Sequence, residues 1–194
     1  MNYEQYLAIY DDVLSGRLTT APYDDPSFIE YARLNHARVH RWEKTLKLMP
    51  ELVELIQNIN EPQQWAIISE PWCGDAAPTL PFLIRLAELN PMITYDIHLR
   101  DEEPFLINSY LTNGTKSIPK LIVRDQNNKD LFTWGPRPKV TQDFIDELKH
   151  RNLSKDEIKA ELQNWYNQNK GEALQKELLT LLKTYKNISG LHLV

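Results

Sequence analysis

The sequence predicts an α/β protein in which a central mixed sheet carries added helices at both ends of the chain. Short apolar runs suited to strands are confined to the middle of the chain, and segments of helical periodicity separate them. Longer helical segments precede and follow this middle part. These observations divide the 194 residues into an N-terminal helical extension at 1–60 that packs on the core, a domain at 61–150 and a C-terminal helical extension at 151–194.

The N-terminal extension has little strand character. Gly16 is a suitable end for its first helix. A longer helix begins near Phe28, where apolar side chains recur at alternating steps of four and three residues. Asn35 interrupts this apolar face, and Pro50 is expected to kink or divide the helix. The face either packs on the following domain, which is favoured, or forms a coiled coil with a partner.

The middle segment has the predicted order β-α-β-α-β-β-α. Its strands are expected at 65–69, 92–99, 119–124 and 130–134. Its helices are expected at about 75–88, at 105–111 and from about 141. A short polar turn joins the last two strands, and this predicts an antiparallel hairpin.

The C-terminal extension is predicted to consist of polar helices. Ser154 and Glu157 have the spacing of a capping box, which marks the start of one helix. The apolar side of that helix is assigned to Ile158, Leu162 and Trp165.

Composition disfavours several classes of partner. The formal net charge is −5, from 22 basic and 27 acidic residues, and this balance argues against broad capture of nucleic acid or of an anionic membrane surface. No apolar run approaches the roughly 18 residues of a membrane span, and the first residues lack the pattern of a signal peptide. We therefore expect a cytoplasmic protein with no nucleic-acid or membrane partner. Composition leaves the oligomeric state open.

Cys73 is the only cysteine, so the chain can form neither an internal disulfide nor a zinc cluster with several thiolates. It falls between the first predicted strand and the following helix. A thiol at a helix N-terminus faces unpaired N–H groups and the positive end of the helix dipole, and both favour the thiolate. From position alone, a lone cysteine is more often a small buried hydrophobic residue, and a reactive thiol with a lowered pKa is the alternative. The residues around Cys73 favour the reactive thiol.

Basic residues surround a histidine pair on the second predicted helix. His36 and His40 have a spacing that can bind a metal, but no third ligand is evident and no metal site is predicted. With Arg33, Arg38 and Arg41 nearby, a solvated basic face is favoured, and binding of an acidic partner or an anion is the alternative. The chain has no glycine-rich phosphate loop, which disfavours a nucleotide enzyme.

The residues around Cys73 resemble the thioredoxin superfamily. The local sequence is Trp-Cys-Gly-Asp, Pro81 lies eight residues after the cysteine, and Pro119 opens the third strand. In that family the attacking cysteine caps the first long helix and a proline kinks this helix. A cis-proline faces the cysteine across the substrate groove. The resemblance covers about residues 60–150 and implies a thioredoxin-like fold.

The resemblance also implies a substrate groove beside Cys73. The residues that it places in this groove are Trp72, Gly74, Asp75, Ala76, Ile118, Pro119, Gly135 and Arg137. The last two belong to a Trp-Gly-Pro-Arg-Pro stretch. Arg137 would lend positive charge to a thiolate or to a carboxylate of a bound thiol compound, and the alternative is a solvated residue in a stiff loop.

Three departures from the family pattern limit the activity. Ala76 stands where thioredoxin has its resolving cysteine, so an external thiol such as glutathione would have to resolve a mixed disulfide at Cys73. Ile67 stands where thioredoxins commonly hold a buried acid. The charge of Asp75 opposes a nearby thiolate. Ordinary dithiol reductase activity is therefore not expected.

Two functions remain open. The first is monothiol thiol–disulfide exchange with Cys73 as the nucleophile, a protein or small-molecule thiol or disulfide as the partner, and an external thiol to release the product. The alternative is a redox-inactive binding or adaptor module that keeps the groove. An iron–sulfur carrier ranks below both, because Cys-Gly-Asp-Ala differs from the Cys-Gly-Phe-Ser motif of cluster-binding monothiol glutaredoxins. No resident cofactor is expected, and whether the protein is an enzyme is left open.

Overall fold

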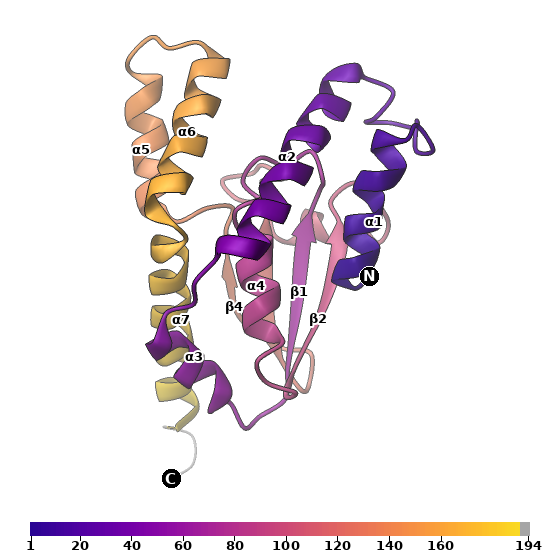
Figure 1. The fold of residues 1–194 in the computed structure, drawn as a ribbon. Helices are drawn as coiled ribbons and strands as arrows, with labels where there is room; N and C mark the ends of the chain where they lie inside the picture. The colour runs from indigo at the N-terminus through magenta and orange to yellow at the C-terminus, as the bar shows by residue number, and fades with distance from the viewer. Residues whose placement is uncertain (191–194) are drawn as a thin grey trace.

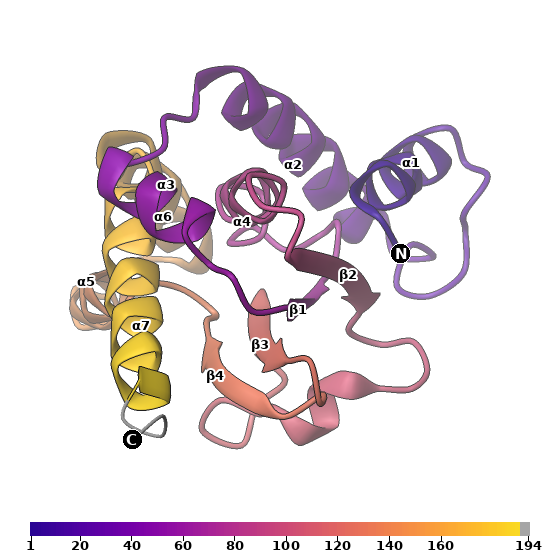
Figure 2. The same ribbon diagram turned by 90° about the horizontal axis from the view of Figure 1, so that it is seen from below.

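The computed structural model describes residues 1–190, with side chains described through residue 185. Four strands form one mixed sheet in the order β2-β1-β3-β4 (Figures 1 and 2). They are β1 (Gln63–Ser69), β2 (Ile93–Leu99), β3 (Lys120–Asp125) and β4 (Asp130–Trp134). β1 pairs parallel with β2 and antiparallel with β3, and β3 pairs antiparallel with β4. The predicted fold class, the strand positions and the hairpin are confirmed.

The central strand β1 is buried from Trp65 to Ser69, as its continuous apolar run predicts. α4 (Leu80–Ala87) connects β1 to β2 and packs on one face of the sheet. The connection from β2 to β3 lies on the opposite face (Figure 2). Its helix η1 (Leu106–Ser109) is a single 3₁₀ turn and is shorter than the helix predicted at 105–111.

Three helices precede the sheet: α1 (Tyr3–Leu14), α2 (Pro26–Thr45) and α3 (Pro50–Gln57). α1 ends just before Gly16, as predicted. The long helix expected from Phe28 is divided near Pro50, as predicted, because α2 ends at Thr45 and Pro50 begins α3. α2 lies over α4, with the ring of Trp42 centred 5.8 Å from that of Phe82 (Figure 2). The apolar face of α2 therefore contributes to the core.

α4 begins at Leu80 and not near Asp75, which corrects the sequence prediction. Pro78 and Pro81 each lack an N–H donor, and a proline ring clashes with the carbonyl four residues earlier, so regular helix cannot extend back through them. Residues 74–79 instead form successive turns, in which the Ala76 N–H donates to the Cys73 carbonyl at 3.2 Å. Pro81 lies in the first turn of α4 and does not kink a longer helix, contrary to expectation.

Three helices follow the sheet: α5 (Lys139–Lys149), α6 (Lys155–Asn169) and α7 (Glu172–Gly190). The capping box at the start of α6 is confirmed, since the Ser154 hydroxyl accepts from the Glu157 N–H and the Glu157 carboxylate accepts from the Ser154 N–H. α6 buries Leu162 and Tyr166, whereas Ile158 and Trp165 are only partly buried. The buried side of α6 is thus rotated by one residue from the predicted one.

α7 runs beside the β4 edge of the sheet and packs against α3 (Figures 1 and 2). The indole N–H of Trp134, the last residue of β4, donates to the Glu177 carboxylate at 2.7 Å. The C-terminal helices therefore attach to the same domain as α2 and α3. Residues 191–194 of the predicted C-terminal extension lie outside the described part of the chain.

Candidate functional site

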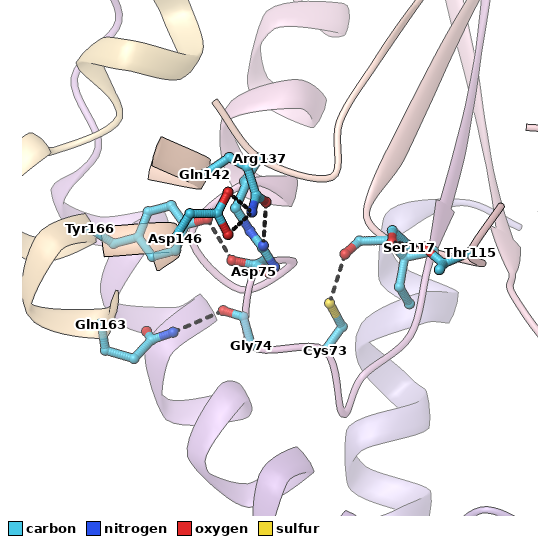
Figure 3. A network of polar contacts seen from close by, with 11 residues as sticks. Cys73, Gly74, Asp75, Thr115, Ser117, Arg137, Gln142, Asp146, Gln163 and Tyr166 are labelled. Atoms are coloured by element: carbon cyan, nitrogen blue, oxygen red, sulfur yellow. Dashed lines mark hydrogen bonds and ion pairs between the residues drawn. The ribbon is translucent and has the colours of Figure 1, made fainter. Parts of the chain in front are cut away.

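Cys73 lies on the loop that joins β1 to α4, opposite the segment that precedes β3 (Figure 3). β1 and β3 are antiparallel neighbours, so the end of β1 lies beside the beginning of β3. The Cys73 thiol donates to the Ile118 carbonyl at 3.3 Å, and the Ile118–Pro119 peptide bond is cis. The fold thus brings together the cysteine and the proline that the resemblance singled out.

The Cys73 thiol is buried, with 6% of the residue exposed. Its pKa is raised to about 12, chiefly by burial and in smaller part by the Asp75 carboxylate. The amide N–H groups of Ala76 and Asp75 and the Arg137 guanidinium act in the opposite direction without offsetting burial. The predicted lowering of this pKa is therefore wrong. The dipole of a helix acts only near its first turn, and α4 begins beyond that reach.

Asp75 is held in a polar network between this loop and the C-terminal helices (Figure 3). Arg137 Nη2 donates to one carboxylate oxygen at 2.5 Å, and the Tyr166 hydroxyl donates to the other at 2.6 Å. The Arg137 and Asp75 side chains are only 20% and 9% exposed. Because both oxygens have a strong donor, the carboxylate is fixed and its charge is largely paired.

Glutamine side chains extend the network on both sides (Figure 3). Arg137 Nη1 donates to Gln142 Oε1 at 2.8 Å, and Gln142 in turn donates to the Asp146 carboxylate. Gln163 Nε2 donates to the Gly74 carbonyl at 3.1 Å. The residues from 72 to 75 are therefore positioned by the C-terminal helices as well as by the sheet.

A groove of about 390 Å³ passes over Cys73. Its lining residues are Trp72, Cys73, Asp75, Arg100, Thr115, Lys116, Ser117, Ile118 and Arg137. The Arg100 guanidinium stacks over the Trp72 ring at 4.6 Å and pairs with the Asp101 carboxylate at 2.5 Å, whereas Lys116 forms no ion pair with any described residue. Because Arg137 pairs with Asp75, Lys116 is the one cation of this lining without a counter-ion among the described residues.

The sequence assigned several residues to the groove, and the structure distributes them over three environments. Those that line it with Cys73 are Trp72, Asp75, Ile118 and Arg137. Gly74 lines a neighbouring cavity, and Ala76 is buried beneath the loop. Pro119 is buried, and Gly135 lies against it so closely that an added Cβ would be 2.3 Å from the Pro119 carbonyl oxygen.

Several residues of the site were not identified from the sequence. Arg100 and Lys116 lie in loops whose path over the cysteine depends on the folded chain. Tyr166 and Gln163 contact residues about ninety positions earlier. Tyr166 was the one signal available in the sequence, because a tyrosine on the buried side of a helix needs a hydrogen-bond partner for its hydroxyl.

The histidine pair that the sequence analysis singled out, His36 and His40, lies on α2 and does not line the groove. The Nε2 atoms of His36 and His40 are 2.8 Å apart, and His40 Nδ1 lies 2.9 Å from the Glu43 carboxylate. Among residues 1–190, no group of three His, Cys, Asp or Glu side chains is arranged to hold a metal ion. No helix in this same range is long and apolar enough to cross a membrane.

The mixed sheet, the cysteine at the end of its central strand and the proline opposite define a thioredoxin-like α/β protein. A family model described as Thioredoxin matches residues 23–149. The chain therefore belongs to the thioredoxin family. The match begins before α2, so α2 and α3 lie within the part of the chain that the family model describes.

Solved structures share this fold at low sequence identity. The crystal structure of an HIV epitope scaffold matches with a TM-score of 0.58 at 18% identity, covering 95% of this chain and 99% of the scaffold. The structure of a protein of unknown function from Pseudomonas aeruginosa matches with a TM-score of 0.50 at 21% identity, covering 72% and 86%. At these identities the likeness shows the fold alone. No curated protein matches the sequence.

Proposed function

We propose that this protein is a thioredoxin-fold binding module whose groove beside Cys73 takes an extended, acidic peptide segment without turning over disulfides. The observation that carries the proposal is the state of the thiol. Cys73 is buried, its pKa is raised to about 12, and it is the only sulfhydryl of the chain.

The raised pKa makes the thiolate rare, and the thiolate is the nucleophile in disulfide exchange. At pH 7 a thiol with a pKa of about 12 is ionised to about one part in 10⁵. A free cysteine, with a pKa near 8.5, is ionised to a few per cent. Attack on a disulfide by Cys73 is therefore disfavoured by about three orders of magnitude before any steric effect of burial.

The groove has the features that an extended acidic segment requires. The Ile118 N–H, just before β3, donates to no acceptor in residues 1–190, so it is available to pair with the main chain of a bound peptide. Lys116, which forms no ion pair with a described residue, supplies a cation for a carboxylate of the segment. In this proposal the Cys73 sulfur is part of the groove surface, and binding does not depend on its ionisation.

The test is a calorimetric titration with S-methylglutathione, a short peptide that has two carboxylates and no free thiol. We expect the parent protein and Cys73→Ala to bind it with the same Kd, and Lys116→Ala to bind it about tenfold more weakly. Lys129→Ala, at an exposed lysine in the β3–β4 turn, is the matched control and should bind like the parent. Absence of saturable binding by the parent would overturn the proposal.

Monothiol exchange is the second candidate function, and one observation favours it. Cys73 lines the groove, and two amide N–H groups and the Arg137 guanidinium all act to stabilise its thiolate. In this reaction the thiolate attacks the glutathione sulfur of a mixed disulfide between glutathione and a substrate thiol, a Cys73–glutathione disulfide forms and the substrate thiolate leaves. Reduced glutathione then attacks this disulfide, the Cys73 thiolate is released and oxidised glutathione leaves. Formation of this adduct at neutral pH as fast as on free cysteine would replace the binding proposal with exchange.

A further inference from the structure

A second cavity lies beside the groove, between α2, the loop at 72–75 and α6, and its volume is about 550 Å³. This volume is typical of sites for small organic ligands. Its walls are largely apolar, and they include the aromatic side chains of Phe28, Tyr31 and Trp72. Leu162 and Leu34 complete the apolar lining, and Leu34 is 50% exposed despite its apolar side chain. The walls are therefore suited to a flat apolar ligand.

Trp72 is a wall that the cavity shares with the groove over Cys73. Its ring makes an edge-to-face contact with Phe28, with the centroids 5.4 Å apart, and it also stacks with the Arg100 guanidinium. Phe28 lines only the cavity, whereas Arg100 lines only the groove. The two sites are thus adjacent and share Trp72 and the Arg137–Asp75 ion pair, but only the cavity has the aromatic wall of Phe28 and only the groove has Arg100.

The cavity contains one positive charge without a counter-ion. Lys159 pairs with Asp156, and Arg137 pairs with Asp75. Arg38 is half-buried, donates only to the Asn35 side-chain oxygen at 2.9 Å, and has no carboxylate partner among the described residues. A half-buried guanidinium without an anion is costly, and a carboxylate is the partner that matches its geometry.

Three buried polar atoms in the lining are also unpaired. The indole N–H of Trp72 and the Nε–H of Arg137 have no acceptor, and Gln163 Oε1 has no donor, within the described chain. Gln163 Nε2 is already held by the Gly74 carbonyl, so the orientation of this amide is fixed. Buried polar atoms are rarely left without partners, and all three belong to side chains that line the cavity.

We propose that this cavity binds a small aromatic carboxylic acid, whose ring lies among Phe28, Tyr31 and Trp72 and whose carboxylate pairs with Arg38. The apolar walls bury the ring, and the uncompensated guanidinium selects an anion. The site does not use Cys73 and stands independently of the function proposed for the groove.

The experiment is a titration with 2-naphthoate, followed by the NMR signals of the Trp72 indole N–H and the Gln163 side-chain amide. 2-Naphthamide, the neutral analogue, is the matched ligand control. We expect saturable shifts with the acid and at least tenfold weaker binding of the amide. Arg38→Gln should weaken binding of the acid at least tenfold, because it removes the charged partner. Arg33→Gln, at an exposed arginine on the same helix, should leave it unchanged.

A second variant tests where the acid binds and leaves the charge of Arg38 unchanged. Ala160 is exposed at the edge of the cavity, so Ala160→Trp can fill the space without disturbing the core, and it should abolish the shifts. This variant tests the site even if Arg38→Gln does not fold. The proposal is overturned if the acid gives no saturable shift, if both variants bind it like the parent, or if the shifts appear at Ser117 in the groove instead.

Discussion

Replacement of Asp75 by asparagine tests the network that joins the loop of Cys73 to the C-terminal helices. The variant keeps the size of the side chain and one oxygen for Tyr166, but it removes the charge that pairs with Arg137. Breaking a buried ion pair by removing one partner typically costs about 3–5 kcal/mol. Arg137 is 20% exposed and keeps its bond to Gln142, so we expect a loss of about 2–3 kcal/mol.

The measurement is urea unfolding at neutral pH, followed by far-UV circular dichroism, for the parent and Asp75→Asn. Asp143→Asn is the matched control, because it removes an exposed carboxylate that pairs with Lys139 on one helical turn. Its unfolding midpoint should match that of the parent. If Asp75→Asn is as stable as Asp143→Asn, the network does not hold the loop to the C-terminal helices and the reasoning is refuted.

The same variant has a second, independent readout at Cys73. The Asp75 carboxylate raises the pKa of the thiol, so the pKa should fall when the charge is removed. It should stay above that of a free cysteine, because burial is the larger cause. An unchanged pKa would mean that the carboxylate does not act on the thiol.

Three further predictions concern the surroundings of the site. Burial raises the pKa of Glu70 from 4.5 to about 7, so the folded state favours the protonated carboxyl. The protonated carboxyl therefore contributes stability that is complete below about pH 4.5 and is lost as the pH rises through about 7. The free energy of unfolding of the parent should therefore fall relative to Glu70→Gln by up to about 3 kcal/mol over this range in urea titrations, and parallel pH profiles would contradict it. Gly135→Ala should cost about 3 kcal/mol or more, because φ is +113° and the added Cβ meets Pro119, whereas Gly114→Ala, which has open space, should cost about 1 kcal/mol; equal losses would refute the close approach. Asn35→Ala should lower the free energy of unfolding by about 1–3 kcal/mol, because it leaves the buried carbonyl to which Asn35 donates without a partner; an unchanged midpoint would show that this bond is dispensable.

The strands were predictable because their signal is local. The run from Trp65 to Ile68 is continuously apolar, and it lies in the central strand β1, where both faces are covered. The capping box at Ser154 is equally local, since it needs only two side chains three residues apart. The start of α4 was misplaced because Pro81 was interpreted as a kink within a longer helix, whereas Pro78 and Pro81 together keep regular helix from extending back to Asp75.

The site was predictable only at the residues that the family motifs include. Cys73 and Ile118 do meet across the groove, although 45 residues separate them. The state of the thiol was mispredicted because burial, which depends on the whole fold, outweighs the local dipole. Tyr166 and Arg38 could not be assigned, since their roles depend on how α6 and α2 lie against the loop at 72–75.

The most direct test of the central claim is the rate of Cys73 alkylation by iodoacetamide from about pH 6 to about pH 10. Cys73 is the only thiol, so labelling reports on it alone. We expect labelling of the folded protein to be far slower than that of free cysteine at neutral pH, and to keep rising with pH without a plateau, because burial holds the thiol protonated. A plateau with an apparent pKa below about 8.5 would show an activated thiolate, contradict the buried-thiol interpretation and favour monothiol exchange.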